Sequence, residues 1–191
     1  MKRLTGVLLG IVLVVGLAGM ASAATSASIT LKIKCVVTLS VDIDQAEYNF
    51  GDVAARTTAI STDTITVSNN SLGRTEDYTI NCSTYTADWN LQTSDPANDE
   101  EDVFSLKALF KDTQAIDGDY GTKAFLDTGV ASQQNMTEAD FGTSGYDGDD
   151  VPAVTAGDRK IWFRLRTPGI TTTEAEQSLS VTITANDASL F

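Results

Sequence analysis

The feature that most constrains this chain is an alternation of apolar and mostly polar residues that runs unbroken through residues 27–43. The apolar positions all carry odd numbers: Ala27, Ile29, Leu31, Ile33, Cys35, Val37, Leu39, Val41 and Ile43. Because successive side chains of a β-strand point to opposite faces, this period of two predicts a strand with one buried face. Fully extended, the segment would span roughly 55 Å at ~3.3 Å per residue, about three times the length of an ordinary strand.

A strand of that length exceeds what one compact domain uses. We therefore expect residues 24–36 to act as a donor strand that completes the β-sheet of another copy, with the odd-numbered residues from Ala27 to Val37 as the assembly strand. In this mode of strand addition, main-chain hydrogen bonds give affinity and alternate side chains fill pockets. The alternative is one strand of the same domain that bends midway, or two consecutive strands.

The first residues have the pattern of an export signal. Lys2 and Arg3 precede an apolar stretch from Val7 to Met20, and the small residues at positions 21–23 resemble a signal-peptidase site. We expect residues 1–23 to be a signal peptide and the mature protein to be secreted, without a membrane span, because no later segment approaches the required ~20 apolar residues. Residues 37–191 are then expected to form one domain.

The charge of the chain excludes one class of partner. It carries 26 acidic and 13 basic residues, a formal net charge of −13. Nucleic acid is not expected as a partner, because phosphate contacts need the opposite sign. The same charge makes copies of the chain repel one another unless cations screen or bridge them.

Cys35 and Cys82 are the two cysteines, and each follows the apolar phase of its segment. Both thiols are expected to face inward. In an oxidising compartment they are a disulfide candidate, within one subunit or between neighbouring subunits if the first segment is donated. Two buried free thiols remain an alternative, because spacing alone does not establish a bridge.

Short alternating runs separated by turn residues recur through the rest of the chain. They predict strands at residues 60–68, 77–82, 89–91, 104–110, 160–166 and 178–184, whereas residues 112–157 are expected to form long acidic loops with a helical turn near 135–141. Thr and Val are abundant and no long helical period occurs. The predicted fold class is all-β, an immunoglobulin-like or jelly-roll β-sandwich with long acidic loops and an extended N-terminal strand.

The residue content argues against an enzyme. The chain has no histidine, which excludes histidine-dependent catalytic triads, and two cysteines cannot form a four-thiolate metal site. No catalytic residues are predicted.

Calcium is the predicted ion, because hard cations select oxygen ligands and acidic loops supply them. None of the acidic clusters is an EF-hand. The alternative interpretation of these clusters is that they are ordinary solvated turns. The candidate ligands lie in three clusters: Asp99 and Asp102; Asp117 and Asp119; and Asp147, Asp149 and Asp150.

Two pairs of segments resemble a known class of protein. Residues 37–42 leading to 48–53, and residues 161–165 leading to 177–185, resemble the opening and closing portions of spore coat protein U-like and related secreted β-sandwich subunits. The resemblance implies an immunoglobulin-like fold that assembles into surface fibres by donor-strand exchange. In general design, the acidic, histidine-free chain also looks like the calcium-dependent subunits of archaeal cannulae, which are extracellular protein tubes.

The sequence therefore predicts a structural subunit of an extracellular filament, tube or coat. Its main partner would be identical copies of itself, in a homopolymer, with a cell-surface anchor or an assembly chaperone as additional partners. The rival prediction is a secreted monomeric adhesin or carbohydrate-binding module that uses Trp89 or Trp162 and the central loops. Against it, an aromatic residue in or near a strand more often serves packing.

Overall fold

A computed structural model describes residues 32, 38–85, 88–127, 133–153 and 157–188. By its internal contacts the chain divides into Met1–Val36 and Val37–Phe191, and the account below concerns the second unit. The predicted signal peptide, residues 1–23, lies outside the described residues, as does the donor-strand candidate apart from Lys32. All six assembly-strand positions, including Cys35 and Val37, also lie outside them.

The described elements are nearly all strands. In chain order they are β1 (Val41–Ile43), β2 (Thr58–Ile60), β3 (Ile65–Asn69), β4 (Glu76–Tyr85), β5 (Asn90–Leu91), β6 (Val103–Phe110), the 3-10 helix η1 (Asp117–Tyr120), β7 (Gln134–Asn135), α2 (Glu138–Phe141), β8 (Arg159–Arg166) and β9 (Leu179–Asp187). The helical turn expected near residues 135–141 is therefore present as α2.

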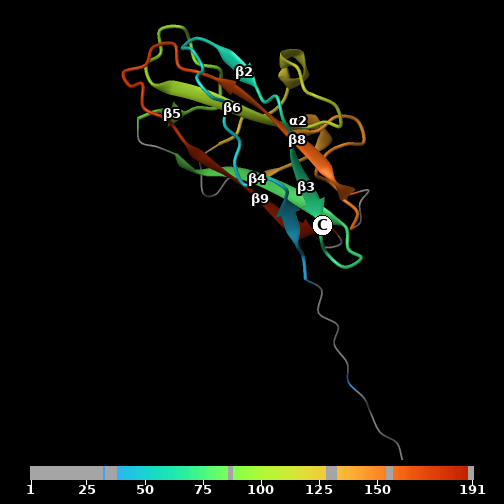
Figure 1. Ribbon diagram of the computed structural model, residues 1–191. Coiled ribbons are helices and arrows are strands. Elements are labelled where there is room, and N and C mark those ends of the chain that lie inside the picture. The colour runs from blue at the N-terminus through green and yellow to red at the C-terminus, as the bar shows by residue number, and fades with distance from the viewer. Residues whose placement is uncertain (1–31, 33–37, 86–87, 128–132, 154–156, 189–191) are drawn as a thin grey trace, which may run out of the picture. The chain divides into compact units, whose positions relative to one another are not determined.

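The strands form two sheets (Figure 1). In the larger sheet the order is β1-β3-β8-β6-β5, and β2 also pairs with β8. In the smaller sheet the order is β7-β4-β9, and the β4–β9 pairing runs antiparallel from Glu76↔Asp187 to Tyr85↔Leu179 with an irregularity between Cys82 and Thr84. The pairings are antiparallel except for β5 with β6.

The prediction of one strand over residues 60–68 is wrong, because two strands occupy that region. β2 pairs with the end of β8 (Ile60↔Arg164) and β3 with its start (Ile65↔Ile161), so residues 61–64 bulge from a shared edge. Ser61 bridges the gap: its N–H donates to the Phe163 carbonyl at 2.9 Å, and its hydroxyl accepts the Phe163 N–H at 3.0 Å. A hydroxyl thus substitutes for a backbone acceptor.

The core lies between the two sheets. Its buried members come from β3, β6 and β8 on one side and from β4 on the other, together with residues of the central loops: Val67, Leu106, Ala108, Phe110, Ile161, Phe163, Tyr78, Ile80, Cys82, Leu126, Met136, Phe141 and Val151. Ile161 and Phe163 face this core, two residues apart as strand geometry requires. The all-β sandwich class is confirmed.

A second, smaller cluster covers the opposite face of the larger sheet. Leu109 and Trp162 pack there against Ala115 and Tyr120 from the segment around η1. On this face of β6 the polar residues Ser105 and Lys107 are also buried, which the polar positions of the alternation do not indicate. Lys107 Nζ donates a hydrogen bond to the Tyr120 carbonyl at 2.9 Å, and desolvation lowers the pKa of its ammonium.

In the part of the chain that the structure describes, no helix is long and apolar enough to cross a membrane.

Candidate functional site: an open seam between β1 and β9

The longest free strand edge among the described residues belongs to β9. β4 pairs with one edge of β9 through Leu179–Asp187, and no described strand pairs with the other edge. In Figure 1, β9 runs beside β4, in dark red against green. Exposed strand edges carry unpaired N–H and C=O groups and are templates for another strand.

The register fixes which backbone groups of β9 are free. On β4, the even-numbered Glu76, Tyr78 and Cys82 bond away from β9, for example from the Tyr78 N–H to the Gly148 carbonyl at 2.6 Å. The odd-numbered residues of β4 therefore bond to β9, at its even-numbered partners such as Thr184. It follows that Val181, Ile183 and Ala185 present their N–H and C=O groups at the open edge, and these groups have no described partner.

The same odd-numbered residues of β9 also turn their side chains to the core. Leu179, Val181, Ile183 and Ala185 pack against the buried cluster but are only half-buried. Across from them, β1 is the edge of the larger sheet; its Val41 packs against the same cluster, and the side chain of Ile43 is 44% exposed. We call the combination of these two strand edges, to which no further described strand pairs, and the incompletely covered apolar residues the open seam.

The chain enters the domain at one end of the open seam. The fully buried Glu76 side chain accepts the Ser40 N–H at Oε1, 2.9 Å away, and Ser40 directly precedes β1. Its Oε2 atom is buried without a described partner. Because Glu76 pairs with Asp187, Ser40 lies at the end of the seam where β9 ends. We call this the arm end, because residues 24–36 lead into it.

Cys82 lies in the core with its side chain 1% exposed, which confirms that this thiol faces inward. Burial raises the pKa of the thiol to about 11, so the nucleophilic thiolate is scarce at neutral pH. Cys82 is opposite Val181 in the β4–β9 register, and β9 therefore separates it from the open edge.

Two of the predicted calcium ligands are held by basic side chains. Asp117 accepts the Arg164 Nε–H at 2.6 Å, and Asp119 accepts from Lys111 Nζ at 2.5 Å. Arg164 also makes a two-bond contact with Asp95, at 2.8 and 3.0 Å. These ion pairs tie the η1 segment to the larger sheet and give both carboxylates a structural use.

The cluster at residues 99–102 is used mostly for local bonding. Asp102 accepts hydrogen bonds from the Thr172 N–H and hydroxyl, which lower the pKa of its carboxyl, whereas Asp99 is exposed. Glu100 accepts the Ala97 N–H at 2.5 Å. The Asp102 bonds connect the loop to the segment that follows β8, whereas the Glu100 bond lies within the loop.

The third cluster is the most crowded with negative charge. Asp147, Asp149 and Asp150 lie beside Asp77 of β4, whose Oδ1 accepts the Asp150 N–H at 2.9 Å. Partial burial, and then the Asp77 carboxyl that shares a hydrogen bond with it, raises the pKa of Asp149. The structure brings Asp77 into this group. The sequence did not indicate this contact, because Asp77 lies more than sixty residues before the cluster.

Asp149→Asn should stabilise the domain at neutral pH. A carboxyl whose pKa is higher in the folded than in the unfolded state contributes stability below the unfolded pKa and loses it as pH rises through the folded pKa. Thermal unfolding of the variant should therefore give a higher Tm than the natural chain at pH 7 and a smaller difference at pH 3. Asp63→Asn, at an exposed loop carboxylate, is the control; an equal Tm change at both pH values would contradict the prediction.

Among the described residues, no group of three or more carboxylates or cysteines is arranged to hold a metal ion. Gly148, which lies between two of these carboxylates, is buried and closely packed: a Cβ atom there would lie 2.6 Å from Met136 Cβ. The loop is therefore held against β4 by its backbone.

The two tryptophans differ in accessibility. Trp162 is 6% exposed and donates its Nε1–H to the Lys111 carbonyl at 2.8 Å, so packing covers its ring. Trp89 is half-buried, lies against Phe104 and bonds Thr171 at 3.1 Å. Trp162 is therefore a packing residue of the second, smaller cluster. Trp89 is the remaining candidate of the carbohydrate-binding hypothesis.

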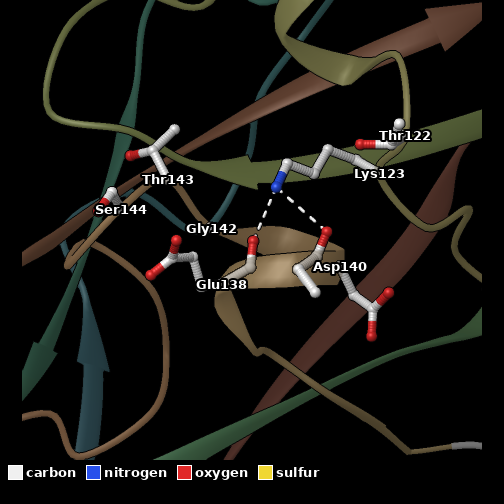
Figure 2. Close-up of a pocket in the computed structure, with 8 residues that line it drawn as sticks. Thr122, Lys123, Glu138, Asp140, Gly142, Thr143 and Ser144 are labelled. Atoms are coloured by element: carbon white, nitrogen blue, oxygen red, sulfur yellow. Dashed lines mark hydrogen bonds between the residues drawn. The ribbon is translucent and has the colours of Figure 1, made fainter.

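A shallow depression lies between α2 and the loop around Lys123 (Figure 2). Lys123 Nζ donates to the Glu138 carbonyl at 2.7 Å and to the Ala139 carbonyl at 3.1 Å, which satisfies two of its three protons. The Glu138 and Asp140 carboxylates do not contact the ammonium in Figure 2. The lysine caps backbone carbonyls, which is a structural use.

No family model matches the chain, and no curated protein matches it.

Proposed function

We propose that this protein is a secreted structural subunit of an extracellular filament, tube or coat, and that residues 24–36 of one copy add as a strand to the open edge of β9 in the next. The observation that carries the proposal is the open seam. Its outward N–H and C=O groups and its half-buried side chains belong to the same residues, Val181, Ile183 and Ala185. Strand addition satisfies both at once.

The pattern of the arm suits that edge. An added strand presents side chains to the core at every second residue, and residues 27–37 are apolar at every second position. Residues 24–36 could extend over roughly 40 Å, whereas β9 needs about 30 Å for its nine residues. The resemblance to spore coat protein U-like subunits and the signal-like residues 1–23 support the same assembly outside the cell.

Calcium enters the proposal as a promoter of assembly. A net charge of −13 opposes association of identical copies, and the Asp77–Asp149 contact shows how closely carboxylates crowd on this surface. Because the described carboxylates do not form a closed site, cations would act between subunits, by bridging or screening acidic loops.

Negative-stain electron microscopy of the mature chain tests both parts of the proposal. Protein purified in chelator is imaged before and after addition of millimolar calcium, with magnesium and a matched ionic strength of sodium chloride as controls. Ordered polymers only with calcium are the expected result. Polymers in every condition would remove the ion requirement, and monomers in every condition, with measurable glycan affinity, would favour the monomeric binding module.

The proposal gives a definite expectation for the disulfide candidate. A strand on the open edge of β9 lies two strand spacings, roughly 10 Å, from β4 and Cys82, whereas a disulfide needs Cα atoms within about 7 Å. We expect polymers without a Cys35–Cys82 bridge between subunits, and normal assembly of Cys35→Ser. Non-reducing gel electrophoresis checks this; a subunit ladder lost in both Cys35→Ser and Cys82→Ser would contradict it.

A further inference from the structure

The most exposed large apolar side chain among the described residues stands on an ordered turn. Leu72, in the turn between β3 and β4, is 96% exposed. Beneath it, the buried Asn69 side chain accepts the Ser71 N–H at 2.9 Å and donates to the Arg74 and Val151 carbonyls at 2.8 Å each. Hydrogen bonds within the turn and to Val151 therefore hold its backbone, so a partner that contacts Leu72 would not have to order this turn.

This turn lies at the arm end of the domain. The Asn70 N–H donates to the Ser40 carbonyl at 2.7 Å, while the Ser40 N–H donates to Glu76. The backbone of Ser40, the residue immediately before β1, is therefore fixed from both sides. Leu72 is two residues from Asn70, which bonds Ser40. Leu72 therefore lies close to the point where the chain enters its own domain, whichever copy residues 24–36 add to.

The opposite end of the sandwich, which we call the far end, also exposes apolar surface. There β9 begins at Leu179, and β6 begins beside Ile170, whose carbonyl accepts the Asp102 N–H at 2.8 Å. Ile170 is 41% exposed, and the half-buried Trp89 reaches the adjacent Thr171. Apolar side chains thus lie at both ends of the open seam.

The direction of strand addition decides which ends meet. The arm runs toward its own arm end, and β9 also runs toward the arm end of its domain. If the arm adds antiparallel to β9, its last residues lie at the start of β9, so the donor's arm end abuts the acceptor's far end. If it adds parallel, two arm ends meet, and two copies can exchange arms in a closed pair. A head-to-tail contact forms an open filament unless its rotation closes a ring, and antiparallel pairs are slightly more stable per residue than parallel pairs.

We infer that successive copies of this chain meet end to end, with Leu72 of the donor against the Ile170 and Trp89 surface of the acceptor. The inference rests on the proposed function and adds the face used by each partner. The contact buries an apolar side chain that the isolated domain leaves almost wholly in water. It also fixes the angle between successive domains, which an extended arm alone leaves free.

Site-specific photo-crosslinking tests the inference in assembled polymers. A benzophenone amino acid replaces Leu72, which folding tolerates because the side chain makes little contact, and crosslinked peptides are identified by mass spectrometry. The matched control carries the same probe at Ile116, which is 64% exposed on the segment leading into η1. Crosslinks from position 72 to residues 88–91 or 168–172 of a second copy are the expected result.

Other outcomes separate this inference from the proposed function. Crosslinks between two 69–74 turns would overturn it in favour of parallel, arm-end-to-arm-end exchange, while leaving strand donation intact. Polymers that form normally but crosslink at position 72 no more than at 116 would also overturn it. If the natural chain polymerises but neither probe-carrying variant does, the Leu72→Ser variant is assembled instead and the persistence length of its polymers is measured. Polymers of that variant with unchanged persistence length contradict the contact, and chains of reduced persistence length support it.

Discussion

Deletion of residues 24–36 should abolish polymers and leave a folded monomer. The β-sandwich core comes from residues after 37, so the deletion removes no described core residue. A synthetic peptide of residues 24–37 should then bind the truncated domain and raise its Tm, because a ligand at a hundredfold excess over Kd stabilises by about 2.7 kcal/mol. Electron microscopy and thermal unfolding measure the two effects. Polymers of normal appearance from the truncated chain would show that this segment is not the donor.

The alternation within the arm supplies a matched pair of variants. Leu31→Asp places a charge on the apolar phase and should prevent assembly, because an unpaired buried charge is costly. Thr30→Asp places the same charge one residue earlier, on the polar phase, and should assemble nearly as well as the natural chain. Equal loss of polymer in both variants would mean that net charge, and not the face of an inserted strand, controls assembly.

Ala185→Pro should block polymerisation without unfolding the domain. Proline lacks an N–H, and the Ala185 N–H points to the open edge, so the β4–β9 ladder keeps its bonds. Alanine is small and half-buried, which limits the loss of packing. An added strand would lose one bond and meet the proline ring. We expect a Tm close to that of the natural chain and no filaments by electron microscopy.

Thr184→Pro is the control, one residue away. Its N–H belongs to the set that bonds to β4, so proline there removes a ladder bond and should destabilise the domain by roughly 1–3 kcal/mol. The pair separates an edge effect from a fold effect. Similar destabilisation by both variants, or full polymerisation of Ala185→Pro, would contradict the assignment of the free edge.

The energetic balance explains why assembly needs both the main-chain groups and the apolar side chains of the open seam. Full burial of a Leu, Ile or Val side chain contributes about 1.5–3 kcal/mol, whereas fixing the backbone of each residue in an added strand costs roughly 1–2 kcal/mol. With one apolar residue in every two, burial and ordering nearly cancel. The main-chain bonds to a preformed edge then decide the outcome, which is why loss of one such bond in Ala185→Pro is expected to be sufficient.

The sequence by itself determined the strand-rich class and the inward phase of each long strand. Period-two alternation at residues 161–165 and 179–183 puts their apolar residues on one face of each strand, because strand geometry is local, and that face is the one toward the core. It also indicated that Cys82 is buried. These features depend only on which residues lie two positions apart.

Only the tertiary structure decided which strand edge lacks a described partner and which carboxylates are held by basic side chains. Sheet order depends on contacts between distant residues, so no local pattern indicates the β9 edge that lacks a described partner, or the approach of Ser40 to Glu76. In the same way, Arg164 reaches Asp117 and Asp77 meets Asp149 across long separations in the chain. A local pattern fixes the direction of a side chain, whereas its partner is set by how the whole chain packs.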